Sequence, residues 1–340
     1  MENLLASKRW PGVTAADVGR RAGTSSAVVS YVMNEGPRPV AAETRERVLR
    51  VARELGYRPH RLASSLRSGR SGFIGLVVPN TDNPYFSALA RSIERAADGA
   101  GLLTFIANAS LSDARERASV NAFLEARVDG LIVIDVGEAT KSGSFDTAPV
   151  PLIWVHHRPD GAPGPLISFD SYSAGRQATE HLLEHGHRRV DCLTGPVDAG
   201  PVTDRLRGWR DALTEAGIRP DPSWVLRSGY DRESAQRTVR AALTAQNIEA
   251  LVAFTDTHAL GAVRGAADLN RHMPDDLALT TCDGTADTEY SVPSLTAVTK
   301  PIGALAKHVI AALQADPVAG VGDEVIGPLT LERRQSCGCT

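Results

Sequence analysis

From residue 72 onward, short apolar runs alternate with amphipathic segments of helical spacing, and this alternation constrains the fold more than any other feature. The runs at 73–78, 102–107, 130–134 and 152–155 are typical of strands buried on both faces. Segments at 86–100 and 113–126 have the spacing of helices between them. Repeated alternation of this kind predicts a parallel sheet with right-handed crossovers.

The same alternation occurs again in the second half of the chain. We expect helices at 173–185, 204–216, 231–244 and 258–269, strands at 190–194, 250–254 and 277–282, then a helix at 302–315 and a strand near 329–334. No residue-level repeat relates the two halves. The pattern predicts an α/β core of two doubly wound parallel-sheet lobes.

Near the N-terminus, the sequence predicts two short helices joined by a tight turn. Thr14 and Asp17 have the spacing of a capping box that starts a helix at 15–22, and Gly23 can adopt the left-handed conformation of a sharp reversal. Ser25 can cap a second helix at 26–33. A third helix at 43–55 completes a three-helix helix-turn-helix head. The shared apolar stripe of the first two helices is Val18, Ala22, Val29 and Val32.

Charge is distributed unevenly along the chain. The first 70 residues carry a net balance of +7, whereas the remainder carries −10. A basic head on an acidic body is typical of proteins that bind a polyanion, although a solvated basic surface gives the same balance. The helix-turn-helix favours DNA as that polyanion, with an ordinary helical hairpin as the alternative.

The compartment and redox state follow from what the sequence lacks. No apolar run approaches the roughly 18 residues of a spanning helix, and the N-terminus has no apolar stretch before a cleavage site. We therefore expect no membrane partner and a cytoplasmic location. The four cysteines are too few and scattered for a disulfide framework, so we expect reduced thiols.

Residues 60–69 have helical spacing but too little apolar surface to fold alone, so we expect a helix there only when something supports it. Across nearly all residues after Gly12, the chain resembles the lactose-repressor (LacI/GalR) family of bacterial transcription regulators. The segments that carry the resemblance are VTAADV at 13–18, AGTS at 22–25, VSYVMN at 29–34, TRERV at 44–48, LGYRP at 55–59, NPYF at 83–86, RVDGL at 127–131, GHRR at 186–189, RLRGW at 205–209 and ERRQSCG at 332–338. One departure is Ala41, where the family usually has a hydroxyl cap worth about 1 kcal/mol.

The resemblance implies a periplasmic-binding-protein-like core and a division of the chain into four parts. These are a DNA-binding domain at 1–57, a hinge helix and linker at 58–70, an N-terminal lobe at 71–170 with about 301–326, and a C-terminal lobe at 171–300 with about 327–340. The implied partners are double-stranded operator DNA, a small-molecule effector and a second copy of the chain. Without a leucine-heptad tail after residue 334, a homodimer is favoured over a tetramer.

The expected DNA contacts come from the helix-turn-helix and the hinge. The N-terminal residues of the second helix, Ser26 and Ala27, and Tyr31 one turn on, are expected at base edges. Leu66 matches the leucine that the family wedges into the minor groove, whereas packing of the linker on the core is the alternative. The full predicted set is Thr14, Ser25, Ser26, Ala27, Val28, Ser30, Tyr31, Asn34, Arg61, Ala63, Leu66 and Arg67.

The expected effector site lies between the lobes, because ligands of open parallel sheets bind at the carboxyl ends of the strands. The residues there that match the family's effector positions are Asn83, Tyr85, Phe86, Asp170, Arg205, Tyr230, Thr255, Asp256 and Asp283, although any of them could instead be a helix cap. Carboxylates and an arginine beside aromatic rings suit a sugar. Purine-binding members have an arginine soon after the Gly-Pro that matches Gly195 and Pro196, and here none precedes Arg205.

Other chemistry receives less support from the sequence. His181, His185 and His187 could suggest zinc, but no fourth ligand lies nearby in sequence, and the Cys337-Gly338-Cys339 pattern alone is weak, so we expect no metal and no cofactor. No Gly-x-Ser-x-Gly elbow supports an acyl hydrolase, and no Gly-x-Gly-x-x-Gly turn supports a dehydrogenase.

The sequence therefore predicts a ligand-responsive, sequence-specific transcription regulator, a repressor, and not an enzyme. Two alternatives share the two-lobe core. A solute-binding protein would need a signal peptide and no helix-turn-helix, and a sugar-modifying enzyme would turn its ligand over.

Overall fold

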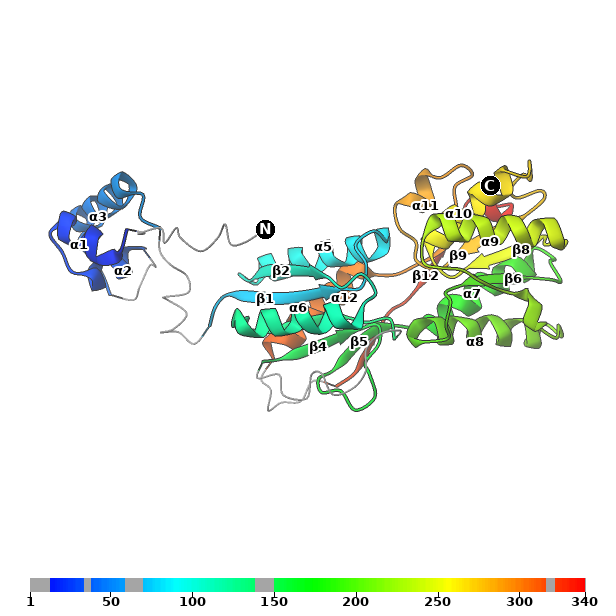
Figure 1. Ribbon diagram of the computed structural model, residues 1–340, viewed down its shortest axis with the longest axis horizontal. Coiled ribbons are helices and arrows are strands. Elements are labelled where there is room, and N and C mark those ends of the chain that lie inside the picture. Colours follow the sequence, from blue (N-terminus) through cyan, green and yellow to red (C-terminus); the bar gives the residue numbers. More distant parts are fainter. Residues whose placement is uncertain (1–12, 34–37, 59–69, 138–149, 316–321, 340) are drawn as a thin grey trace, which may run out of the picture. The chain divides into compact units, whose positions relative to one another are not determined.

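The structure is a computed structural model that describes residues 13–33, 38–58, 70–137, 150–315 and 322–339. The chain divides into two compact units, Met1–Ser71 and Gly72–Thr340, which are described separately (Figure 1). The predicted hinge segment at 60–69 lies outside the described residues. None of the helices in the described ranges is long and apolar enough to cross a bilayer.

The first unit contains the helices α1 (Ala15–Ala22), α2 (Ser26–Met33) and α3 (Ala42–Leu55). The predicted capping box forms, because Thr14 accepts from the Asp17 amide while Asp17 accepts from the Thr14 amide at 3.0 Å. Gly23 ends α1 in the left-handed conformation at φ +64°. The predicted stripe is buried with Val48, Val51 and Ala52 of α3. Ala41 is the N-cap of α3 and makes no side-chain hydrogen bond, as expected for an alanine where the family usually has a hydroxyl group.

The second unit contains two sheets, each with helices on both faces. The first lobe is built on the strand order β11-β5-β4-β3-β1-β2, in which all pairs are parallel. Helices α5 and α12 pack on one face and α6 packs on the other. Its elements are β1 (Phe73–Val78), α5 (Pro84–Gly99), β2 (Leu103–Asn108), α6 (Asp113–Glu125), β3 (Leu131–Ile134), β4 (Leu152–Val155), β5 (Leu166–Phe169), α12 (Ile302–Gln314) and β11 (Glu324–Ile326).

The second lobe has the strand order β12-β10-β9-β8-β6-β7, parallel except for the antiparallel β10–β12 pair. Helices α7 and α8 cover one face, whereas α9 and α10 cover the other. Its elements are α7 (Ser171–Glu184), β6 (Asp191–Thr194), α8 (Gly200–Glu215), η1 (Pro222–Trp224), β7 (Val225–Arg227), α9 (Arg232–Ala245), β8 (Ala250–Ala253), α10 (Asp256–Ala267), β9 (Ala278–Thr281), α11 (Asp287–Tyr290), β10 (Thr296–Thr299), β12 (Thr330–Glu332) and η3 (Gln335–Cys337).

The prediction that all four early strands are buried on both faces is wrong for β2. This strand lies at the edge of its sheet, and Leu103, Phe105 and Ile106 are 45%, 42% and 45% exposed. Phe105 stacks on Phe73 with ring centroids 4.7 Å apart, so its inner side is packed while its outer side is open. Strand β2 is therefore an apolar edge and not a core strand.

Two glycines allow α7 and α8 to pack backbone against backbone. A Cβ at Gly175 of α7 would lie 2.2 Å from the Arg205 carbonyl oxygen, and one at Gly208 of α8 would lie 2.2 Å from the Tyr172 carbonyl oxygen. These distances exclude any side chain larger than hydrogen without a shift of a helix. Close packing of α7 and α8 fixes where Arg205 leaves α8.

Candidate functional site

A cavity with about 600 Å³ of empty space, part of which is open to solvent, lies between the two lobes of the second unit. Its lining comes from both lobes: Asn80, Asn83, Tyr85, Phe86, Leu111, Val136 and His156 from the first, and Pro201, Val202, Arg205, Tyr230, Thr255 and Asp283 from the second.

The cavity forms at the carboxyl ends of parallel strands. Asn83 follows β1 and caps α5 by accepting from the Tyr85 amide at 2.9 Å, which fixes the aromatic residues of the first turn. Thr255 follows β8 and caps α10 by accepting from the His258 amide at 3.1 Å. Asp283 follows β9 after one intervening residue, Cys282. Several lining residues thus occupy the loops that parallel topology brings to one edge.

A buried carboxylate beside two cations forms the floor of the cavity. The Oδ1 atom of Asp283 lies 2.7 Å from the Lys300 ammonium nitrogen and 3.4 Å from the Arg205 guanidinium. Arg205 also donates to the carbonyl oxygen of Phe254. Burial alone would raise the pKa of Asp283, but Lys300 and Arg205 outweigh it and hold that pKa below its ordinary value. The buried Asp256 carboxyl group lies beside Asp283, so the floor brings together two carboxyl groups and two cations.

Aromatic side chains of the first lobe form a wall of the cavity. The Tyr85 hydroxyl lies 3.0 Å from the His156 Nε2 atom, and Tyr85 and Phe86 meet edge to face with centroids 5.5 Å apart. The Lys300 ammonium lies 4.4 Å from the Tyr85 ring centroid, which links this wall to the floor. His156 has φ +73°, a strained backbone for a residue other than glycine. Burial and then Lys300 lower the pKa of His156 to about 3, so the ring is neutral.

Seven of the nine predicted effector residues line the cavity: Asn83, Tyr85, Phe86, Arg205, Tyr230, Thr255 and Asp283. The sequence analysis missed Asn80, Leu111, Val136, His156, Pro201 and Val202, and also Lys300 beneath them. Arg205 was expected to open its helix, but α8 begins five residues earlier, at Gly200, with Pro201 in its first turn. Arg205 therefore projects from the second turn.

Asp170 and Asp256 do not line the cavity. Asp170 caps α7, and its two carboxylate oxygens accept from the Ser173 amide at 2.9 Å and hydroxyl at 2.5 Å. Asp256 is buried behind the lining, where it accepts from the Thr281 hydroxyl at 2.8 Å and the Thr285 amide. Both residues hold loops beside the cavity and neither lines it, so their contact with ligand stays a prediction.

The second helix of the helix-turn-helix exposes its N-terminal end. Ser25 caps α2 by accepting from the Val28 amide at 3.3 Å. Of the predicted DNA contacts, Thr14, Ser25, Ser26 and Ala27 are exposed, whereas Val28, Ser30 and Tyr31 are half-buried. Asn34, Arg61, Ala63, Leu66 and Arg67 lie outside the described residues.

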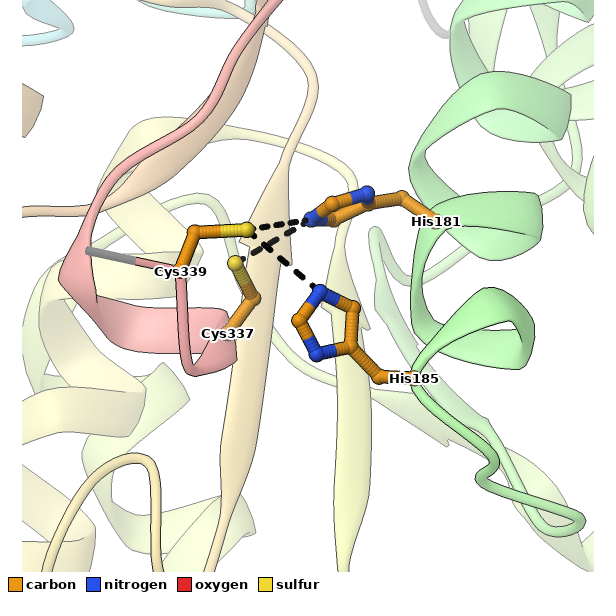
Figure 2. A group of neighbouring side chains, drawn as sticks. All are labelled: His181, His185, Cys337 and Cys339. Atoms are coloured by element: carbon orange, nitrogen blue, oxygen red, sulfur yellow. Dashed lines mark hydrogen bonds between the residues drawn. The ribbon is translucent and has the colours of Figure 1, made fainter.

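The structure also joins two patterns that the sequence analysis weighed separately. His181 and His185 at the end of α7 lie against Cys337 and Cys339 of the C-terminal segment (Figure 2). Burial would raise the pKa of the Cys337 thiol, but hydrogen bonds with His181 and Thr296 outweigh it and lower that pKa to about 6. Cys337 and Cys339, about 150 residues away in sequence, therefore supply the further metal ligands that are absent from the sequence around the two histidines.

A helix-turn-helix unit and a two-lobe core with an interlobe cavity define a ligand-responsive DNA-binding regulator. Family models match both parts: "Bacterial regulatory proteins, lacI family" matches residues 14–60, and "Periplasmic binding proteins and sugar binding domain of LacI family" matches residues 71–295. The chain belongs to the LacI family of bacterial transcription regulators.

Named relatives are regulators of transcription. The ribose operon repressor of Halalkalibacterium halodurans is 32% identical over 85% of this chain and 86% of its own length. The transcriptional regulator DegA of Bacillus subtilis is 30% identical over 85% of this chain and 87% of its own. The crystal structure of the Lac repressor dimer bound to operator and the anti-inducer ONPF matches with a TM-score of 0.83 and 26% identity, over 96% of this chain and 99% of that chain.

Proposed function

We propose that this regulator is a cytoplasmic repressor whose effector is a sugar bound in the interlobe cavity. The observation that carries this proposal is the composition of the cavity. A carboxylate with an arginine suits a ring of hydroxyl groups, and Tyr85, Phe86 and Tyr230 offer apolar faces for the ring itself. A solved relative, the transcriptional regulator CelR in complex with cellobiose, supports this class of ligand.

A nucleobase is the second candidate effector. Purine repressors are among the relatives, including PurR of Edwardsiella ictaluri at 31% identity over 86% of this chain. Against this candidate, the segment 197–204 supplies no arginine to the cavity before Arg205. Arg205 in the cavity lining would also suit a phosphorylated sugar, so sugar phosphates belong in the same test.

For DNA, we propose that α2 enters the major groove with Ser26, Ala27 and Tyr31 at base edges. The exposure of Ser26 and Ala27 supports this, since a serine hydroxyl and an alanine methyl can reach bases without rearrangement of the head. The proposed interface also includes Leu66 as the minor-groove wedge. Its remaining residues are Thr14, Ser25, Val28, Ser30, Asn34, Arg61, Ala63 and Arg67.

We further propose that the chain acts as a homodimer. A second copy could bury two sets of exposed apolar residues. These are Leu103, Phe105 and Ile106 on β2, and Tyr290 at the end of α11 with Val292 just after it. Phe105→Lys should shift the sedimentation equilibrium toward monomer. Leu49→Lys, which replaces an apolar residue exposed on the separate N-terminal unit, is the matched control.

The experiment that tests the effector is a thermal-shift screen of the full chain with sugars, sugar phosphates and nucleobases. A ligand at a hundred times its dissociation constant should raise the free energy of unfolding by about 2.7 kcal/mol. Stabilisation by a sugar or sugar phosphate supports the proposal. Stabilisation by purines alone would replace it with the second candidate, and turnover of the ligand would indicate an enzyme.

A further inference from the structure

Four side chains that can ligate a metal converge away from the interlobe cavity. His181 lies in the last turn of α7 and His185 is its C-terminal cap, so the two rings lie one turn apart on the same side of the helix. Cys337 ends η3, and Cys339 follows after one residue. In Figure 2 the two sulfur atoms point toward the two imidazole rings, and the four candidate ligand atoms lie within 4.8 Å of one another.

The backbone of the C-terminal segment holds both cysteines in this position. Ser336 is fully buried, donates its hydroxyl to the Leu279 carbonyl at 2.6 Å and accepts from the Thr296 amide at 2.9 Å. Gly338 then takes the left-handed conformation at φ +94°, which turns the chain so that Cys339 returns toward His185. The thiols are thus presented by backbone that is anchored to β9 and β10.

Distances between the candidate ligand atoms match a tetrahedral metal centre. The His181 Nε2 atom lies 3.1 Å from Cys337 Sγ and 3.5 Å from Cys339 Sγ, and His185 Nε2 lies 3.4 Å from Cys339 Sγ. With zinc bonds of about 2.3 Å to sulfur and about 2.0–2.1 Å to nitrogen, tetrahedral geometry places sulfur and nitrogen about 3.6 Å apart. Only small side-chain movements are needed.

We propose that His181, His185, Cys337 and Cys339 bind one Zn²⁺ ion in a closed Cys₂His₂ site. This donor set, with borderline imidazole and soft thiolate ligands in a tetrahedral arrangement, is the one that zinc prefers. Each thiol gives its proton to solvent when the metal binds. All four positions are filled by protein, so the ion stabilises structure and has no open position for catalysis.

Groups around the four ligands fit this assignment. The Nδ1 atom of His181 is buried and makes no hydrogen bond to the described residues, and the Glu184 carboxylate lies 3.7 Å from it. A carboxylate beside the second nitrogen of a ligating histidine orients the ring and raises its basicity. The Thr296 hydroxyl lies 2.9 Å from Cys337 Sγ and can hydrogen-bond to a thiolate.

The ion would join the C-terminal end of the second lobe to the end of α7. Helix α7 begins next to Asp170, where the chain passes from the first lobe to the second, and it packs against α8, which carries Arg205. Bound zinc would therefore stabilise the helix pair behind the cavity. This inference rests on the four side chains alone and stands whether or not the effector is a sugar.

The test is the metal content of the full chain purified from zinc-supplemented cells and desalted with a thiol-free reductant. Elemental analysis should find one zinc per chain in the parent protein. His185→Gln and Cys339→Ser should each lose the zinc ion, because each removes one ligand. Both residues lie near the surface, so they can be replaced without opening the core. His187→Gln, two residues beyond His185, and Cys192→Ala, in the same lobe, are the matched controls and should keep the full zinc content.

Cobalt substitution identifies the ligands independently of stability. The Co²⁺-loaded parent should show intense visible ligand-field bands and a near-ultraviolet charge-transfer band from two thiolates. Cys339→Ser should weaken the charge-transfer band and reduce affinity by more than the roughly 10- to 100-fold typical of an outer-shell change. Glu184→Gln should reduce affinity within that range.

Three results would overturn the assignment. One is a parent protein that binds no zinc at micromolar free metal although its thiols are reduced. Another is equal zinc loss in the His187→Gln control. The third is a Cys337–Cys339 disulfide in protein isolated under alkylating conditions, which would make the cluster a redox pair instead.

Discussion

The Lys300 ammonium and the Asp283 carboxylate form a buried pair at 2.7 Å, with side chains only 1% and 2% exposed. Arg205 approaches the same carboxylate oxygen at 3.4 Å, so one anion faces two cations. Burying a charge carries a high desolvation cost, which an oppositely charged partner and hydrogen bonds must offset. Of the two cations, Arg205 lines the cavity, so it is the one that can meet electron-rich oxygens of a ligand.

We predict that Asp283→Asn lowers the free energy of unfolding by about 3–5 kcal/mol, because it leaves two buried cations without their anion. Combining it with Lys300→Met should recover part of this loss. Urea denaturation of the two single variants and the double variant measures the coupling. If the double variant equals the sum of the singles to within about 0.5 kcal/mol, the pair is not coupled and this description is wrong.

We predict that Gly175→Ala lowers stability by about 1–3 kcal/mol, because the new methyl group collides with the backbone of Arg205. It should also weaken effector binding, since α8 must move and take Arg205 with it. Gly303→Ala in α12 is the matched control, because a Cβ there meets no described atom within 4 Å. The control should be neutral or stabilising by up to about 1 kcal/mol. Equal losses in both variants would contradict the packing argument.

The sequence predicts elements well where capping residues mark their ends. Helix α1 and helix α2 begin and end at the predicted residues, because the Thr14 cap, Gly23 and the Ser25 cap mark the boundaries. Strands β5, β7, β10 and β11 were missed because each contains no more than two consecutive apolar residues, which is a weak signal. Sequence also cannot show that β2 lies at an edge, since an apolar run looks the same with or without a covering helix.

The residues of the candidate sites also divide into those that the sequence could predict and those that it could not. Tyr85 and Asp283 could be expected in the cavity because they follow predicted strands, whereas Lys300 follows β10, a strand that the sequence analysis missed. Asp170 has the sequence features of a ligand contact and of a helix cap, and only the Ser173 hydrogen bonds distinguish the two. The histidine and cysteine cluster depends on a tertiary contact that sequence spacing does not contain.

We predict that acidification destabilises the core between about pH 6.5 and pH 4. Burial lowers the pKa of His156 to about 3, from an ordinary 6.5. Burial also lowers the pKa of His258 to about 4, although the hydrogen bond with Gly229 and the charge of Asp283 oppose it. In this window the unfolded chain binds the protons and the folded chain does not, so stability rises with pH by up to about 1.4 kcal/mol per unit for each histidine. The raised pKa of Asp256 opposes this at the acidic end.

Denaturation by urea at a series of pH values measures the slope, and His258→Gln should flatten it. The folded protein already holds this ring neutral, with Nε2 3.0 Å from the Gly229 carbonyl oxygen, so the amide can replace that hydrogen bond. An unchanged slope in the variant would show that other groups dominate.

We predict that operator affinity falls steeply with salt between about 50 and 200 mM, because lysine and arginine of the +7 head release counterions from DNA. Tyr31→Ala should change which operators are preferred, whereas Arg67→Gln should weaken all operators alike. Leu66→Ala should reduce DNA bending while leaving effector binding intact. Binding titrations against an operator library and circular-permutation gels measure these effects. A flat salt dependence, or the same bend with Leu66→Ala, would contradict the proposed interface.

We predict reciprocal coupling between effector and operator through the orientation of the two lobes. The cavity lining comes from both lobes, so a ligand that binds one lobe arrangement more tightly shifts the population toward it. If effector weakens operator binding by some factor, operator must weaken effector binding by the same factor.

Tyr230→Ala should lower effector affinity about tenfold, equivalent to about 1.4 kcal/mol, because the ring lines the cavity and stacks near His258. Operator affinity without effector should be unchanged. Val197→Ala, an exposed residue of the adjoining loop outside the lining, is the control. Asp283→Ala should abolish the response altogether. Calorimetry with the identified effector, with and without operator, measures all four quantities of the cycle. Should Asp283→Ala bind that effector with unchanged affinity, the effector does not occupy this cavity.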